Sequence, residues 1–141
     1  MSIYLDASAI LPSLVDEPMS DSVQRFLASH PDRLISDFAA AEVAAALSRM
    51  VRTQQLDVSN ANLRLADFDA WRAATSTSVD LRAVDARLAG AYVRRFDLML
   101  HAPDALHLAL ARRVDATLVT LDRRMARAAE ELGISVAMPT A

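Results

Sequence analysis

Two acidic residues closely follow short apolar segments of this chain. Asp6 follows residues 2–5 and Asp122 follows residues 116–120, and a helical pattern comes after each acid. Strands that alternate with helices form parallel sheets, and parallel strands end at the same edge. We therefore expect the two carboxylates to lie at one edge of a sheet, which is where open α/β sheets bind their ligands.

Two more acids are candidates for the same site. Asp104 lies in the first turn of the helix that leads into residues 116–120, and Glu42 lies on a long helix but off its apolar stripe. Two carboxylates about 4 Å apart repel by roughly 4 kcal/mol at an effective dielectric constant of about 20, so four together require a cation. Oxygen ligands favour Mg²⁺ or Mn²⁺ over Zn²⁺, and a substrate phosphate would complete the coordination shell.

Each acid also has a purely structural interpretation. Asp6 can cap the helix that follows it, although Ser8 is a competing cap, and Asp122 can cap the helix that it precedes. Asp104 in a first helical turn complements the helix dipole. Glu42 has no basic residue three or four positions away, so a local ion pair does not explain it, and a solvated or paired surface acid is the weaker interpretation of this residue.

Histidine and serine add little to the candidate chemistry. His107 lies three residues after Asp104, and we interpret it as a packed or hydrogen-bonded helix residue in preference to a metal ligand. The chain has no G-x-S-x-G turn with a histidine partner, so a serine hydrolase has no support.

The elements that must position these residues follow from the spacing of apolar residues. The pattern predicts one α/β domain spanning residues 1–141, with a mainly parallel sheet of four to five strands. Strands are expected at residues 2–5, 34–36, 76–79, 116–120 and 134–136. Helices are expected at residues 9–14, 20–30, 38–52 with Asp37 as the cap, 59–74, 84–96, 103–113 and 123–132 with Gly133 closing the last.

Composition excludes several classes of protein. The chain has 141 residues, of which 53% are hydrophobic, so one domain with a sizeable core is expected. It has no cysteine and two glycines, which removes thiolate chemistry, P-loops and dinucleotide-binding turns. The net charge of −3 argues against a general basic surface, so a nucleic acid would have to meet a local patch. Without a basic leader or an apolar run of about 20 residues, a cytoplasmic protein is expected.

The motifs together resemble those of the PIN-domain nucleases, and within that family the VapC ribonuclease toxins of toxin–antitoxin pairs. The resemblance covers essentially the whole chain. It rests on residues 3–9 (IYLDASA), Glu42 early in a long helix, residues 103–109 (PDALHLA) and residues 118–122 (LVTLD). It implies a three-layer α/β/α fold and hydrolysis of RNA phosphodiester bonds that depends on Mg²⁺ or Mn²⁺.

The resemblance also implies roles for individual residues and partners. The implied catalytic and metal-binding residues are Asp6, Glu42, Asp104 and Asp122. Ser8 and Thr120 would support the site or contact substrate. Separately from the resemblance, the arginines that flank the motifs are candidates to contact RNA phosphates, although arginines on helix surfaces are more often only solvated: Arg112, Arg113, Arg123 and Arg124. A homodimer is implied, as is a VapB antitoxin whose C-terminal tail occupies the groove.

Two alternatives remain open from the sequence. Phosphoacceptor receiver domains are also small α/β folds with acids and Mg²⁺ at the sheet edge, but they use a lysine near the phosphoacceptor and this chain has no lysine. A PIN fold that has lost activity and binds only RNA or its antitoxin is the other alternative, and the intact set of acids argues against it.

Overall fold

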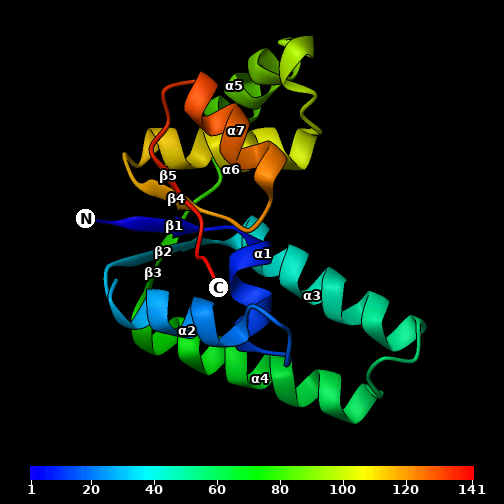
Figure 1. Ribbon diagram of the computed structural model, residues 1–141. Helices are drawn as coiled ribbons and strands as arrows, with labels where there is room; N and C mark the ends of the chain where they lie inside the picture. The colour runs from blue at the N-terminus through cyan, green and yellow to red at the C-terminus, as the bar shows by residue number, and fades with distance from the viewer.

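A five-stranded parallel sheet forms the centre of the computed structural model, which describes all residues 1–141. The spatial order is β3-β2-β1-β4-β5, so the first strand of the chain is the central strand (Figure 1). The strands are β1 (Ile3–Leu5), β2 (Arg33–Ser36), β3 (Ser76–Val79), β4 (Thr117–Val119) and β5 (Val136–Ala137). The predicted α/β class and parallel sheet are confirmed.

Helices cover both faces of this sheet, giving three layers (Figure 1). One face carries α1 (Ala7–Ile10), the 3₁₀ turn η1 (Leu11–Ser13), α2 (Ser20–Ala28), α3 (Asp37–Arg52) and α4 (Val58–Thr75). The other carries α5 (Ala83–Val93), the 3₁₀ turn η2 (Phe96–Leu98), α6 (Ala102–Arg113) and α7 (Arg123–Glu131). No helix combines the length and apolar character needed to cross a membrane.

The alternation of side chains along β1 divides the core between these two layers. Ile3 and Leu5 pack into the cluster beneath α1 to α4, whereas Tyr4 packs into the cluster formed with α5, α6 and α7. All three side chains are fully buried. This follows from the two-residue period of a strand, and it places the hydroxyl of Tyr4 on the α6 side of the sheet.

The sheet register aligns the ends of the two central strands. Leu5 of β1 pairs with Val119 of β4, so the next residue on each strand, Asp6 and Thr120, leaves the sheet at the same level. The strand β2 pairs with β1 on its other side and leads directly into α3. The carboxyl edge of the three central strands therefore presents Asp6, Thr120 and the start of α3.

Several element boundaries differ from the sequence expectation. Ser36, and not Asp37, caps α3, because its hydroxyl accepts a hydrogen bond from the Ala39 N–H at 3.0 Å. The first helix begins at Ala7 because Asp6 is its cap, with Ser8 inside the first turn. Phe96 lies outside α5 in η2 and is 83% exposed, so its helical spacing from Tyr92 was misleading.

Candidate active site

Asp6 is a buried carboxylate at the end of the central strand. Its side chain is almost completely covered, at 3% exposure. Oδ1 accepts hydrogen bonds from the Ser8 hydroxyl at 2.7 Å and from the Ala9 N–H at 3.0 Å, and Oδ2 accepts one from the Thr120 hydroxyl at 2.6 Å. The helix-cap interpretation of Asp6 is therefore correct, but capping uses only one of its two oxygens.

No cationic side chain is paired with Asp6. All three of its donors are neutral, and Asp6 takes part in none of the ion pairs of the structure. Burial raises the pKa of Asp6, and the hydrogen bonds from Thr120 and Ser8 offset only part of this effect. A buried carboxylate without a compensating cation is unfavourable in a folded protein, and such groups are concentrated at functional sites.

Thr120 and Ser8 connect the loops that follow β4 and β1. Besides bonding to Asp6, the Thr120 hydroxyl accepts the Asp122 N–H at 3.0 Å and lies 3.2 Å from the Ser8 hydroxyl. The Ser8 hydroxyl in turn accepts the Leu121 N–H at 2.9 Å. The two hydroxyls thus hold the Asp6 carboxylate and the chain before Asp122 in one hydrogen-bonded network.

The hydrogen-bond partner of Glu42 lies on α6, which covers the other face of the sheet. His107 of α6 contacts the Glu42 carboxylate through Nε2, and its Nδ1 lies 2.7 Å from the Tyr4 hydroxyl. The Tyr4 hydroxyl is also 2.8 Å from the hydroxyl of Ser36, the cap of α3. The His107 side chain is 2% exposed, whereas that of Glu42 is 32% exposed. The interpretation of His107 as a hydrogen-bonded helix residue is confirmed.

Asp104 and Asp122 both bond to the backbone at helix starts. The Asp104 carboxylate accepts the His101 N–H at 3.3 Å, completes a capping box at the start of α6 and is 20% exposed. The Asp122 carboxylate caps α7 by accepting the N–H groups of Arg124 at 2.9 Å and Met125 at 3.2 Å through one oxygen. The structural interpretations of both acids hold, and each keeps an oxygen that these bonds do not use.

The four acids surround the carboxyl edge of the sheet without converging on one point. No group of three or more ionisable side chains is close enough to hold one metal ion. The predicted cluster is therefore looser than expected, because His107 holds Glu42 and helix capping holds Asp122. The oxygen donors nevertheless fit Mg²⁺ or Mn²⁺, since Mg²⁺ is commonly held by one or two carboxylates with water and a substrate phosphate completing its shell. The uncompensated charge of Asp6 is the structural feature that such an ion would neutralise.

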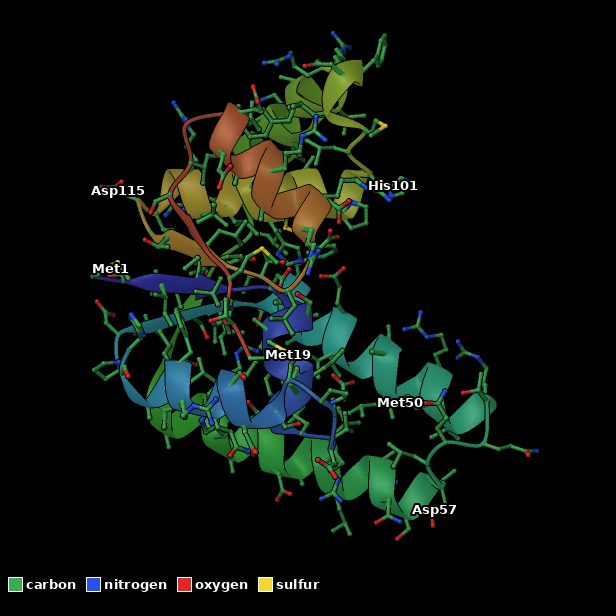
Figure 2. The ribbon with its side chains drawn as sticks, viewed as in Figure 1. Met1, Met19, Met50, Asp57, His101 and Asp115 are labelled. Atoms are coloured by element: carbon green, nitrogen blue, oxygen red, sulfur yellow. The ribbon has the colours of Figure 1, made fainter.

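The flanking arginines do not share one location. Arg123 is exposed in the first turn of α7, next to Asp122. Arg112, by contrast, donates to the Leu132 carbonyl at 3.1 Å and lines a surface pocket with Ser2, which precedes β1. It therefore lies at the edge where the strands begin, opposite the edge that carries Asp6, which does not favour the predicted contact with substrate there. The helix α6 runs along the direction of the strands, so its two ends, marked by His101 and Asp115 in Figure 2, lie at opposite edges of the sheet.

Arg113 also has its partner away from the Asp6 site. Its guanidinium group donates to both carboxylate oxygens of Asp85, at 2.7 and 3.1 Å. This ion pair joins α6 to the first turn of α5. The sequence hypothesis that Arg113 contacts RNA is replaced by a structural role. Arg124 is exposed and lines a small pocket with Met99 and Arg127.

Sequence reasoning missed Tyr4 and Ser36, whose hydroxyls support His107. The sequence offered a local signal for each residue. Tyr4 is a polar side chain within the apolar central strand, and Ser36 ends β2 immediately before a helix. Neither signal identifies a partner, since Tyr4 and His107 are 103 positions apart.

Both the sequence and the fold are similar to those of known proteins. Residues 3–131 match the family model described as PIN domain. The sequence is 37% identical to Ribonuclease VapC46 of Mycobacterium tuberculosis over 142 residues, covering 99% of this chain and 98% of that protein. Similar folds include VapBC2 of Rickettsia felis bound to a promoter DNA fragment, with a TM-score of 0.74, 17% identity and 98% of each chain covered. Another is VapC20 of M. tuberculosis, a sarcin–ricin loop cleaving toxin, with a TM-score of 0.73 and 19% identity over 90% of this chain and 95% of that one.

Proposed function

The chain belongs to the PIN domain family, and from this premise we propose that it is a metal-dependent endoribonuclease, the toxin of a VapBC-type toxin–antitoxin pair. The full-length identity with Ribonuclease VapC46 supports the activity, and the VapBC complexes among the similar structures support the pairing. The proposed cofactor is Mg²⁺ or Mn²⁺.

The buried, uncompensated carboxylate of Asp6 is the observation that carries this proposal. Three neutral donors orient it at the end of the central strand, so the protein has fixed a negative charge without a protein cation beside it. When bound, a divalent ion supplies Lewis-acid activation of water and of the scissile phosphate. A side-chain nucleophile is then not required.

The proposed roles of the other residues follow from their positions. Asp6 and Asp104 are the principal metal ligands, and Glu42 and Asp122 complete the site directly or through water. Ser8 and Thr120 hold Asp6 in one orientation, which reduces the cost of reorganising the site during the reaction. Asp104, Asp122 and Glu42 each keep one carboxylate oxygen without a hydrogen bond, whereas Asp6 Oδ2 accepts a single bond, from Thr120, and so keeps a lone pair for a metal ion.

The proposal also covers contact with RNA, the partner protein and the oligomeric state. Arg123, which is exposed beside Asp122, would contact an RNA phosphate. A VapB-type antitoxin would restrain the activity, and a homodimer is the proposed form of the protein. An RNA substrate and an antitoxin of this kind are consistent with action in the cytoplasm.

Expression in a bacterial host tests the proposal. The wild-type chain should arrest growth, and co-expression of the small protein encoded beside it should restore growth. Asp6→Asn should be harmless at an equal protein level. The matched control is Asp115→Asn, because Asp115 is exposed, lies at the far end of α6 and has a φ of 53°, which asparagine also tolerates. Normal growth with abundant, folded wild-type protein would contradict the toxin assignment.

A further inference from the structure

A continuous chain of hydrogen bonds connects the start of α3 to Glu42 on the same helix, by way of two other elements. It runs from the Ser36 hydroxyl to Tyr4 of β1, from Tyr4 to His107 of α6, and from His107 to Glu42. Ser36 itself accepts the Ala39 N–H. Residues on β1 and α6 thus determine where a side chain of α3 is held.

When the His107 ring is neutral, the chemistry of the groups sets the direction of each bond in this chain. A glutamate carboxylate can only accept, so His107 Nε2 carries the proton and donates to Glu42. In the neutral ring Nδ1 then accepts, and the Tyr4 hydroxyl must donate to it. Burial raises the pKa of Tyr4, which keeps its phenol protonated as a donor. The Ser36 hydroxyl, which accepts from Ala39, donates in turn to Tyr4.

We propose that His107 is a positioning residue that holds the Glu42 carboxylate at the active-site edge, and that Tyr4 fixes the imidazole tautomer in which it does so. This inference rests on the proposed function and assigns His107 a role through Glu42 alone. His107 does not contact substrate.

The burial pattern favours positioning over simple packing. His107 lies among the apolar residues of α6, where a polar ring is costly unless both nitrogens are paired, and both are. The rings of Tyr4 and Phe38 also lie against the imidazole, with centroids at 5.7 and 5.1 Å, so the ring cannot turn freely. Glu42 uses one oxygen for His107, and its other oxygen has no protein donor. A leucine at position 107 would satisfy packing alone. A fixed imidazole instead holds one oxygen of the Glu42 carboxylate, which leaves the other oxygen free and fixed in direction.

Variants of graded severity test the role. His107→Leu removes both bonds, His107→Gln retains an amide donor near the position of Nε2, and Tyr4→Phe removes only the phenol O–H. Outer ligand partners of this type typically contribute about 10- to 100-fold to metal affinity or activity. We expect His107→Leu to lower kcat for RNA cleavage within that range with little change in KM, and to weaken Mn²⁺ binding measured by calorimetry without RNA. His107→Gln should recover part of the loss, and Tyr4→Phe should cause a smaller one.

A double-mutant cycle with Glu42→Gln decides whether His107 acts through Glu42. In the Glu42→Gln background, His107→Leu should cost no further activity or Mn²⁺ affinity. His30→Gln, at the end of α2, is the matched control and should change neither readout. An equal loss in both backgrounds, or no loss in wild type for both His107→Leu and Tyr4→Phe, would overturn the proposal. If wild-type protein cleaves no RNA, the proposed function fails, while the Mn²⁺ titrations still decide the role of His107. Should His107→Leu fail to fold, Tyr4→Phe carries the test.

Discussion

The Thr120 hydroxyl donates a 2.6 Å hydrogen bond to Asp6 Oδ2 across the two central strands, although the residues are 114 positions apart in the chain. The bond is a direct result of sheet register, because Leu5 and Val119 are paired and these residues come next. Pairing of β1 with β4 therefore builds the middle of the core and the candidate site at once. Disruption of either strand is expected to affect both stability and activity.

The Asp6→Asn variant should be more stable than wild type at neutral pH in the presence of EDTA. Burial raises the pKa of Asp6, so the folded protein binds this proton more tightly than the unfolded chain does. The free energy of unfolding therefore falls as the pH rises from the ordinary carboxyl pKa through the raised one. Asparagine does not pay this cost, and its amide can donate to Thr120 while Thr120 turns its own proton toward Ser8, 3.2 Å away.

Thermal unfolding at several pH values measures this effect. The Tm of Asp6→Asn should exceed that of wild type at pH 7, and the gap should close as the pH is lowered below the raised pKa. For a domain of this size, each kcal/mol corresponds to a Tm change of roughly 2–5 °C. A lower Tm for Asp6→Asn at neutral pH would show that the charge of Asp6 is compensated within the folded chain.

Replacing Thr120 by valine should lower stability and weaken the support of Asp6 and of the chain at Asp122. Valine has nearly the same shape, but it removes the donor to Asp6 and the acceptor of the Asp122 N–H. Loss of a buried hydrogen-bond partner costs about 1–3 kcal/mol, and we expect urea unfolding to report a loss in that range. RNA cleavage should fall as well. Unchanged stability and unchanged cleavage together would contradict the supporting role of Thr120.

Arg123 at the start of α7 and Arg112 at the end of α6 are expected to differ in their effect on RNA binding when each is replaced by alanine. In the inactive Asp6→Asn background, Arg123→Ala should weaken RNA binding and lower the slope of log Kd against log salt concentration by roughly 0.7. Arg112→Ala should change neither quantity, since Arg112 lies at the edge where β1 begins. Fluorescence anisotropy with labelled RNA at several salt concentrations makes the comparison. A larger effect from Arg112 would place the RNA on the opposite side of the sheet.

Arg113→Met should lower stability without lowering cleavage. Burial works to raise the pKa of Asp85, but hydrogen bonds from Arg113 and the Arg82 N–H outweigh it, so the pKa of Asp85 is lowered. The stability contributed by this acid is present above the ordinary carboxyl pKa and is lost as the pH falls through the lowered one. Removing Arg113 leaves a carboxylate that is 1% exposed without its charged hydrogen-bond donor, which should cost roughly 1.5–3 kcal/mol at pH 7.

Urea unfolding of Arg113→Met at pH 7 and in acid checks this. The loss should be greatest at neutral pH, and cleavage by the folded variant should match wild type because the ion pair joins α5 to α6 and does not contact the network around Asp6. A stability loss that is equal at every pH would mean that packing, and not the ion pair, explains it.

The sequence was sufficient where local chemistry determines the structure. The bounds of α7 follow from Asp122 as its cap and from Gly133, whose φ of 72° suits a glycine after a helix. The parallel sheet follows from alternating strands and helices. Asp37 was wrongly preferred to Ser36 as the cap of α3, because adjacent residues with equal capping propensity are not separated by sequence alone.

Contacts between distant elements were beyond the reach of local patterns. Glu42 has no partner within a helical turn, and its actual partner, His107, lies 65 positions later on the other side of the sheet. Arg112 shows the converse case. It is near Asp104 in sequence, but a helix of 12 residues is about 18 Å long, so its ends face different edges of the sheet.

Cleavage of total bacterial RNA by the purified protein, with Mg²⁺, Mn²⁺ or EDTA, tests the central claim most directly. Asp6→Asn and Asp104→Asn serve as the inactive variants, and Asp115→Asn serves as the matched control. We expect discrete fragments that require the divalent ion and both acids, with the Asp115 variant as active as wild type. Fragments that persist with Asp6→Asn, or no cleavage by folded, antitoxin-free wild-type protein, would contradict it.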